Sequence, residues 1–367
     1  MQRQKYVDIV KGICIICVVY SHINIIGSVG ESLSKYLNMF ISQFFLSAFF
    51  IIGGFYLKNM DTFTIFLKNK VLRNYKKLII YYIPFVLLHN FFIRNGIYEI
   101  HYLYDTKIME IYTLKTLVIK IFGTSLLMGR EPILGALWFF VVQIMGLIGL
   151  SMIVSLSHKI SEKFNLNSDF ITLFMLFLSL CFSTVMTQQF QITIPRASIA
   201  LSIMILIYFG KLFNQDLKLK YNNIYIFFFS ITILILNCIF VGKLQLNINQ
   251  IYNPITFLSS AFAGLYMLCY LSKKIANNKF GSALSICGKY SFDIMVFHFL
   301  CFKIPMYLLD KLNIENFSPL SSLVPSTSNL FCFFLYILAG VVFPILATKL
   351  LGCLKQFILF RKEKNLI

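Results

Sequence analysis

Residues 6–25, YVDIVKGICIICVVYSHINI, form an apolar run that is interrupted by ionisable side chains. A membrane-spanning helix needs about 20 predominantly apolar residues, and this run has that length. Asp8, Lys11 and His22 lie within it, although an ionisable side chain inside a spanning helix costs about 2.5–3.5 kcal/mol on insertion scales. We therefore predict a spanning helix whose ionisable side chains face the interior of a helix bundle.

These three side chains share one face of the predicted helix. Asp8 and Lys11 are three residues apart and so lie on the same side. His22 follows Lys11 after about three turns of 3.6 residues, which is about 16 Å along the helix axis. Considered alone, Lys11 could be a lysine that extends its ammonium to the membrane surface. His22 alone could be an interior histidine held by a hydrogen bond. Their common face favours a joint role, with a cation near the cytoplasmic end and an imidazole deeper in the membrane.

The whole chain has the composition of a polytopic membrane protein. Of its 367 residues, 58% are hydrophobic and only 13% are charged, whereas soluble domains carry about 25% charged residues. This composition excludes soluble enzymes, secreted disulfide scaffolds and disordered chains. The nine cysteines are scattered through apolar segments, where they act as small hydrophobic residues. Cys14 and Cys17 have no second ligand pair, so we expect no metal site.

Ten apolar segments predict an all-α helix bundle of about ten transmembrane helices, in a single membrane domain over residues 1–367. The predicted spans are roughly 8–28, 36–57, 78–93, 134–156, 170–187, 195–213, 222–241, 254–272, 290–309 and 330–352. The segment 109–131 is interrupted by polar residues and is predicted to be an amphipathic or re-entrant helix.

Lysine and arginine determine the predicted orientation. With the N-terminus inside, 23 of the 33 basic residues lie in cytoplasmic segments and 10 lie outside, so the positive-inside rule places both termini in the cytoplasm. The net charge of +19 comes from short basic clusters between apolar runs, which is the pattern of cytoplasmic loops. We therefore reject nucleic acid as a partner and expect membrane lipids around the chain. The first apolar run lacks a cleavage site and is predicted to be an uncleaved anchor.

A basic cluster follows the second predicted span. The stretch FLKNKVLRNYKK, residues 66–77, carries Lys70 and Arg73 three residues apart on a predicted helix at the membrane surface. Six cations lie between residues 58 and 77, and Asp61 is the only acid among them. Such a cluster can hold a multiply charged anion such as a nucleotide phosphate. It also fits a positive-inside loop beside anionic lipid head groups.

Polar and aromatic side chains in two later spans complete the candidate site. The stretch GKYSFDIMVFHFL, residues 288–300, contains Asp293 and His298, which are five residues apart and need not touch. Trp138 in GALWFF is either an interface anchor or the wall of a ligand channel. We expect the remaining histidines to be solvated or interfacial; they are His89, His101 and His158.

Together these segments resemble the acyltransferase-3 family of integral-membrane acyltransferases, which modify cell-surface polysaccharides, lipopolysaccharide or peptidoglycan. Family members carry an Asp, then Arg or Lys three residues on, then His eleven residues later, and Asp8, Lys11 and His22 match this order. The more familiar family sequence has Arg at the position of Lys11. Lysine keeps the charge but lacks the planar fork that binds phosphate through two hydrogen bonds.

Later motifs extend the resemblance over most of the chain. The basic pair of the family, usually Arg-x-x-Arg, looks like Lys70 and Arg73 here, again with one lysine. The stretch around Trp138 resembles a Leu-Trp-Phe motif of the family. Gly288, Ser291 and His298 match its late Gly-x-x-Ser…His helix. The SGNH-type esterase domain that some members append is not expected here, since the chain ends in FRKEKNLI.

The resemblance implies transfer of an acetyl group from cytoplasmic acetyl-CoA to a hydroxyl of a surface glycan or lipid-linked oligosaccharide, in a bacterial cytoplasmic membrane. Lys11, Lys70 and Arg73 would hold the CoA phosphates. His22 would act as general base on a sugar hydroxyl or carry the acyl group transiently, and the sequence leaves both open. Substrate-binding side chains are expected at Asp8, Trp138, Asp293 and His298.

Two other readings compete with this one. A transporter or flippase of a lipid-linked sugar would also need a helix bundle with buried His, Asp and Lys. The chain shows no internal repeat of the kind common in such carriers, which speaks against it. The other class of membrane acyltransferases pairs a histidine with Asn or Asp in a reaction chamber. His298 could take that part, but its surroundings do not resemble that class.

Overall fold

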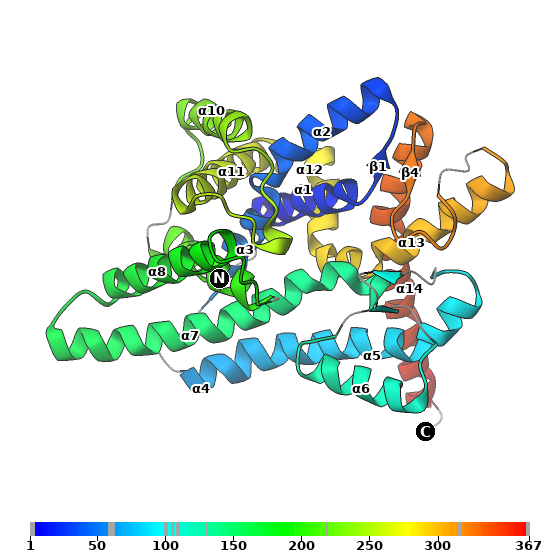
Figure 1. The fold of residues 1–367 in the computed structure, drawn as a ribbon, viewed down its shortest axis with the longest axis horizontal. Helices are drawn as coiled ribbons and strands as arrows, with labels where there is room; N and C mark the ends of the chain where they lie inside the picture. Colours follow the sequence, from blue (N-terminus) through cyan, green and yellow to red (C-terminus); the bar gives the residue numbers. More distant parts are fainter. Residues whose placement is uncertain are drawn as a thin grey trace.

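A computed structural model describes residues 4–57, 63–98, 102–103, 106–107, 111–129, 131–194, 196–216, 219–314 and 318–364. Most of this is helix (Figure 1). The α-helices are α1 Lys5–Ser21, α2 Ser28–Ser42, α3 Phe45–Gly54, α4 Phe63–Phe66, α5 Leu72–Arg94, α6 Leu114–Ser125, α7 Trp138–Phe164, α8 Ser168–Gln188, α9 Ala197–Lys211, α10 Ile224–Phe240, α11 Pro254–Ile275, α12 Lys279–Lys289, α13 Ser291–Lys311 and α14 Leu330–Lys364.

Short elements join or extend these helices. Two-residue strands form two small sheets, in which β1 pairs in parallel with β4 and β2 pairs antiparallel with β3. Their bounds are β1 Asn24–Ile25, β2 Tyr102–Leu103, β3 Thr106–Lys107 and β4 Ser326–Thr327. The 3₁₀ turns are η2 Pro132–Leu137 and η4 Leu246–Ile248, and the π-helical turns are η1 Leu67–Val71 and η3 Leu212–Asp216.

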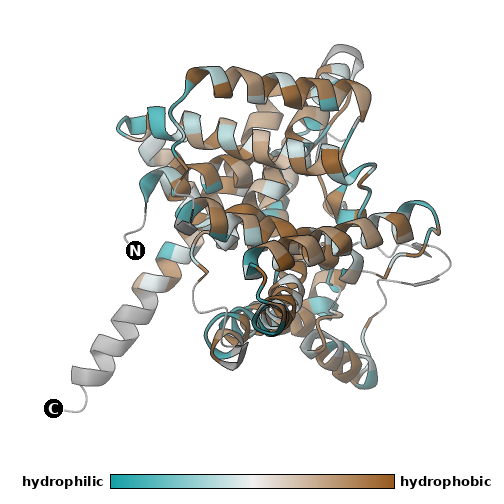
Figure 2. Ribbon diagram, turned by 90° about the vertical axis from the view of Figure 1, so that its left-hand side faces the viewer, coloured by the Kyte–Doolittle hydropathy of each residue, from teal (hydrophilic) through white to brown (hydrophobic). Residues whose placement is uncertain are grey.

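The helices have the length and surface of a membrane bundle. Within the described residues, eight helical stretches are long and apolar enough to cross a membrane. Large apolar side chains remain exposed on their outer faces, for example Phe228, Phe229 and Phe240 of α10. Figure 2 shows hydrophobic residues along the helices and hydrophilic ones concentrated at their ends. Lipid solvates such a surface, whereas water would not. The predicted all-α membrane bundle is confirmed.

Each of the ten predicted spans contains a helix, but the boundaries differ. The first span was expected to run to residue 28, and α1 instead ends at Ser21 because the chain leaves the helix to pair β1 with β4. The second span is broken near Phe44 into α2 and α3. Helices α1 and α10 have 17 residues each, slightly fewer than a typical span. Within the segment 109–131, Leu114–Ser125 forms α6, an amphipathic helix of 12 residues, as predicted.

Glycines let the helices that carry the site approach very closely. A Cβ atom on Gly288 of α12 would lie 1.7 Å from the backbone oxygen of Asp8, and one on Gly12 of α1 would lie 2.0 Å from Leu284 O. Gly54 of α3 and Gly210 of α9 make a similar contact. Small residues at helix crossings are typical of membrane bundles. These contacts place α1 in the centre, against α3, α11, α12, α13 and α14 (Figure 1).

Candidate active site

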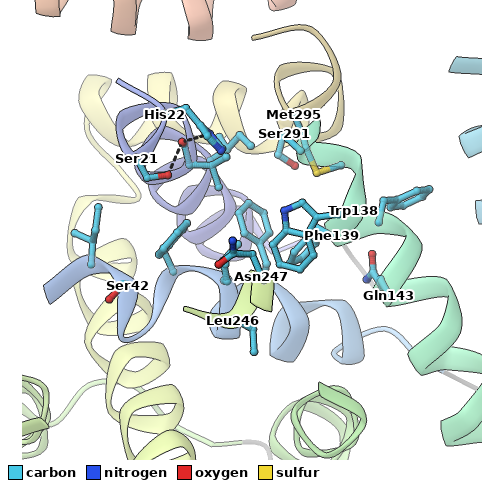
Figure 3. A pocket seen from close by; sticks show the side chains of 18 of the residues that line it. Ser21, His22, Ser42, Trp138, Phe139, Gln143, Leu246, Asn247, Ser291 and Met295 are labelled. Carbon is cyan, nitrogen blue, oxygen red and sulfur yellow. Dashed lines mark hydrogen bonds between the residues drawn. The ribbon is translucent and has the colours of Figure 1, made fainter. Parts of the chain in front are cut away.

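A cavity of about 430 Å³ opens beside α1 in the middle of the bundle. Five parts of the chain wall it: α1, the α2–α3 segment, α7, the loop between α10 and α11, and the first turns of α13. Figure 3 shows side chains from these elements converging on one space. The polar and aromatic lining residues are Lys11, Ser21, His22, Asn38, Ser42, Phe45, Phe49, Trp138, Phe139, Phe140, Gln143, Lys243, Gln245, Asn247, Ser291 and Phe292.

Lys11 and His22 both line this cavity, which confirms their predicted common face. Both belong to the α1 segment, and the helical rise separates them by about 16 Å along the axis. The cavity therefore runs along the helix from the lysine toward the histidine. A cationic group and an imidazole share one enclosed space, mostly walled by apolar side chains, as in many substrate sites.

The backbone selects the tautomer of His22. This residue caps the C-terminal end of α1, and its Nδ1 lies 2.9 Å from the backbone oxygen of Val18. The same oxygen accepts a hydrogen bond of 2.8 Å from the Ser21 hydroxyl (Figure 3). A carbonyl oxygen only accepts, so Nδ1 carries the proton and Nε2 keeps a free lone pair. His22 is thus prepared to accept a proton or to attack at Nε2.

A second histidine lies directly beside the first. His298 of α13 is fully buried, and its ring centroid is 5.1 Å from that of His22. Its Nδ1 lies 3.0 Å from the backbone oxygen of Ile294, and its Nε2 has no hydrogen-bond partner among the described residues. Phe299 packs against both rings, at 4.7 Å from His22 and 4.2 Å from His298. His298 lies behind the cavity wall and is not one of the lining residues.

Trp138 begins α7 at the point where the chain leaves the 3₁₀ turn η2. Its half-buried ring lines the cavity, and Phe139 packs edge-on against it with ring centroids 6.1 Å apart. The structure therefore places Trp138 as a wall of the cavity, which is one of the two roles that its motif allowed.

Asp293 faces α5. The Tyr81 hydroxyl donates a hydrogen bond of 3.0 Å to its Oδ1. The Lys77 ammonium lies 3.5 Å from the ring centroid of Phe292, the neighbouring residue. Ser291 and Phe292 line the cavity, whereas Asp293 is not among its lining residues. The structure brings Asp293 next to the cavity wall but not into the cavity.

The remaining predicted site residues, Asp8, Lys70 and Arg73, lie outside the cavity. Asp8 is 3% exposed and packs at the crossing of α1 with α12. The Lys70 ammonium donates to the backbone oxygen of Tyr56 at 3.2 Å, three residues beyond Gly53, which lines the cavity. Arg73 is exposed in the first turn of α5. None of these three predicted residues is among the lining residues, so the structure groups only Lys11, His22 and Trp138 inside the cavity.

The expectation that His89 is solvated or interfacial is wrong. His89 is fully buried, and its Nδ1 donates to Glu131 Oε1 at 2.7 Å. The Tyr98 hydroxyl donates to the same oxygen at 3.0 Å, and the ring of Tyr112 stacks on the imidazole at 3.6 Å. Burial, followed by the charge of Glu131, raises the pKa values of Tyr98 and Tyr112. A polar cluster thus anchors the segment that leads into Trp138.

The remaining two histidines have different outcomes. His158 was expected in a loop but lies half-buried in α7, near the Ser168 hydroxyl. His101 falls outside the described residues. Among the described residues, no three His, Cys, Asp or Glu side chains gather closely enough to hold a metal ion.

Sequence reasoning missed the polar side chains of the α10–α11 loop. Lys243, Gln245 and Asn247 line the cavity, as do Asn38 and Gln143. They stand in no recognisable motif, and only the fold brings the loop over α1. The one available signal was the density of Asn, Gln and Lys in residues 243–250, KLQLNINQ.

Comparison with protein families gives one match. A family model described as an acyltransferase domain matches residues 4–349, which is nearly the whole chain. The comparisons with curated proteins and with solved structures give no significant match.

Proposed function

This chain belongs to the acyltransferase-3 family and is therefore a multi-pass membrane acyltransferase, and on that premise we propose its donor, acceptor and catalytic residues. The acyl group is acetyl, the donor is cytoplasmic acetyl-CoA, and the acceptor is a hydroxyl of a surface or lipid-linked polysaccharide. The membrane is the bacterial cytoplasmic membrane. One observation carries the proposal: Lys11 and His22 line one cavity about three helical turns apart.

The donor enters from the side of Lys11. Its phosphates carry several negative charges, and charge-assisted hydrogen bonds hold such groups well. Lys11 lies in the cavity wall, and Lys70 binds the carbonyl of Tyr56 close to cavity-lining Gly53. Arg73 is exposed one turn further along. These three cations hold the phosphates, and the pantetheine arm extends along α1 toward His22.

His22 supplies the base. The acceptor hydroxyl gives its proton to Nε2 while its oxygen attacks the thioester carbonyl. The tetrahedral intermediate collapses with cleavage of the carbon–sulfur bond, and the sulfur leaves with the proton that His22 returns. The products are the acetyl ester and free CoA. The geometry that carries this step is the Nδ1 hydrogen bond to Val18 O, because it leaves Nε2 unprotonated before reaction.

The same lone pair would serve a covalent route, in which the acyl group rests on Nε2 before the sugar takes it. The two routes differ in what accumulates without an acceptor. Mass spectrometry of purified protein after incubation with acetyl-CoA separates them, since only the covalent route leaves an acetylated His22 peptide.

Trp138 positions the acceptor sugar. Its ring and the amides of Gln143 and Asn247 line the cavity together (Figure 3). An aromatic wall with a few polar groups that fix orientation is the usual construction of a small-molecule site. We favour an acyltransferase over a transporter, because the family match is to an acyltransferase domain.

The first test is mass spectrometry of surface polysaccharide from cells that carry the wild-type gene, a deletion, or His22→Ala. We expect the acetyl groups to disappear in the deletion and in His22→Ala while the glycan itself remains. His158→Ala is the matched control, because His158 lies outside the cavity, and it keeps acetylation. Acetylation that survives in His22→Ala would remove His22 from the reaction. Loss of the whole glycan in the deletion would favour the transporter reading.

A further inference from the structure

The loop between α10 and α11 is firmly held at its first end. Gly242 has a φ of +86°, which favours glycine. The side-chain amide of Gln43 donates to its backbone oxygen at 2.6 Å. Two residues later, the backbone NH of Leu244 donates to the Ser42 hydroxyl at 3.2 Å. These bonds fasten the loop to the end of α2.

The second end is held by a buried asparagine. Asn249 is 1% exposed, and its side-chain amide donates to the hydroxyls of Ser183 and Thr187, both at 2.8 Å. The Ser202 hydroxyl donates to its Oδ1 at 2.8 Å. Leu246, between the two anchors, is also 1% exposed. A loop held in this way presents its remaining side chains from a fixed backbone, as a binding site requires.

Those remaining side chains point to the cavity. Lys243, Gln245 and Asn247 alternate along the loop and all line it. In Figure 3, Asn247 reaches into the cavity from the loop and Trp138 reaches into it from α7. The side chain of Lys243 is exposed, so its ammonium is accessible to a ligand.

The loop lies at the opposite end of the bundle from the donor entrance. Helix α11 starts just after the loop, at Pro254, and spans 22 residues, which is about 33 Å. At its far end, Lys273 lies over the ring of Tyr6, near the start of α1, with 5.0 Å between ammonium and ring centroid. Lys11 lies six residues from the start of α1, about 9 Å along its axis, and so in the half of the helix nearer that end. The loop that carries Lys243 lies at the other end of α11.

The charges in the cavity wall have one sign. Among the lining residues that the structure describes, Lys11 and Lys243 are cationic and none is Asp or Glu. A cleft lined by one sign of charge raises the local concentration of ligands of the opposite sign. In the proposed function, Lys11 binds the anionic donor. The second cation, Lys243, is therefore available to bind a second anionic ligand.

We propose that residues 243–247 form the acceptor subsite and that Lys243 selects an acceptor sugar bearing a carboxylate or a phosphate. The inference rests on the proposed function and names its substrate class. Gln245 and Asn247 hydrogen-bond the sugar hydroxyls, and the ammonium of Lys243 pairs with the anion. The carboxylate of a uronic acid and the phosphate of a sugar phosphate share this chemistry, and the test separates them.

The single tryptophan makes binding directly measurable. Trp138 is the only tryptophan in the chain and lines the same cavity, so its fluorescence reports occupancy. Purified full-length protein is titrated at constant ionic strength with trigalacturonate, with its carboxyl-reduced neutral trisaccharide, and with N-acetylglucosamine 1-phosphate. We expect at least one of the two anionic sugars to bind about tenfold tighter than the neutral sugar, as one charge-assisted contact allows.

Substitutions tie the preference to one residue. Lys243→Gln removes the preference for the anionic sugar, and Lys243→Glu reverses it. Lys115→Gln is the matched control, because Lys115 is an exposed lysine of α6 outside the cavity, and it keeps the wild-type preference. Gel filtration shows that each variant is folded, and Lys243→Gln carries the test if Lys243→Glu fails to fold.

Three results would overturn the inference: equal binding of charged and neutral sugars, an unchanged preference in Lys243→Gln, or no response to either anionic sugar. A parallel titration with acetyl-CoA keeps this failure distinct from failure of the proposed function. Donor binding with no anion preference would remove only the role of Lys243. Absence of donor binding and of acetyl transfer would remove the proposed function itself.

Discussion

The imidazole rings of His22 and His298 lie 5.1 Å apart, centroid to centroid, although they come from opposite ends of the chain. Each ring places Nδ1 within hydrogen-bond distance of a backbone oxygen of its own helix, Val18 O for one and Ile294 O for the other. Both Nε2 atoms therefore hold lone pairs at the start of the reaction. The ring of Phe299 packs against both imidazoles, so the three rings hold one another in place beside the cavity.

Replacement of His298 tests this packing. In His298→Ala we expect kcat to fall by roughly 10- to 100-fold, because the lost ring packs beside His22 and Phe299, and a misplacement of a reacting group by about 1 Å can cost about 100-fold in rate. The KM for acetyl-CoA stays within about twofold, since His298 does not contact the donor site. Steady-state kinetics with the purified variant measures both kcat and KM. An equal loss in His158→Ala, or a change in KM alone, would contradict this role.

A second prediction concerns the cations that are proposed to bind the donor phosphates, Lys11, Lys70 and Arg73. In Lys11→Ala the Kd for acetyl-CoA rises by about 10- to 100-fold, as expected for one lost contact to a phosphate. The double variant Lys70→Ala/Arg73→Ala has a higher Kd for acetyl-CoA than Lys11→Ala has. Its kcat at saturating acetyl-CoA stays nearly unchanged. Titration with acetyl-CoA followed by Trp138 fluorescence measures the affinity.

Lys68→Ala is the control for these variants, because Lys68 is an exposed cation on the same segment that lines a separate, apolar groove. Unchanged affinity for acetyl-CoA in both Lys11→Ala and the double variant would show that these cations do not bind the donor phosphates. In that case the cationic cluster would serve topology and anionic lipid head groups alone.

Gly288→Ala is expected to disrupt the crossing of α1 with α12. The added Cβ would lie 1.7 Å from the backbone oxygen of Asp8, and a backbone atom cannot move away by changing rotamer. Overpacking of this kind costs about 1–3 kcal/mol or more, so Tm in detergent falls and acetyl transfer is lost with it. Gly352→Ala is the control, since no atom beyond its chain neighbours and its own helix backbone lies within 4 Å of its Cβ position. An unchanged Tm for Gly288→Ala would contradict this close crossing of α1 and α12.

The buried pair of His89 and Glu131 is predicted to stabilise the outer segment. Both side chains are almost fully buried and lie 2.7 Å apart. Removal of one partner of a buried pair costs about 3–5 kcal/mol, because the other is left without compensation. His89→Ala therefore lowers Tm far more than His158→Ala does, in thermal unfolding of detergent-solubilised protein. Activity falls as well, since this segment continues into η2 and Trp138. A Tm equal to that of His158→Ala would refute the prediction.

Local sequence was sufficient for the parts of the site that lie on one helix. The spacing of Lys11 and His22 is a property of 3.6 residues per turn, and it predicts the common helix face from which both side chains line the cavity. The apolar runs were likewise sufficient for a helical membrane bundle, because lipid requires every backbone group to bond within its own segment. The motif around Trp138 left an interface anchor and a wall of a ligand channel both open, and the fold places the ring in the cavity wall.

Tertiary packing decided which distant segments meet. Nothing in the local pattern brings His298 to His22, Glu131 to His89, or Lys243 to the cavity, since each contact depends on how helices far apart in the chain pack together. That packing depends on close approaches such as Gly12 with Gly288, where the absence of a side chain permits a crossing that a Cβ atom would block. The helical repeat depends only on neighbouring residues in the sequence. The enclosed site depends on how the surfaces of distant helices fit together, and the spacing of residues along the chain does not reveal that fit.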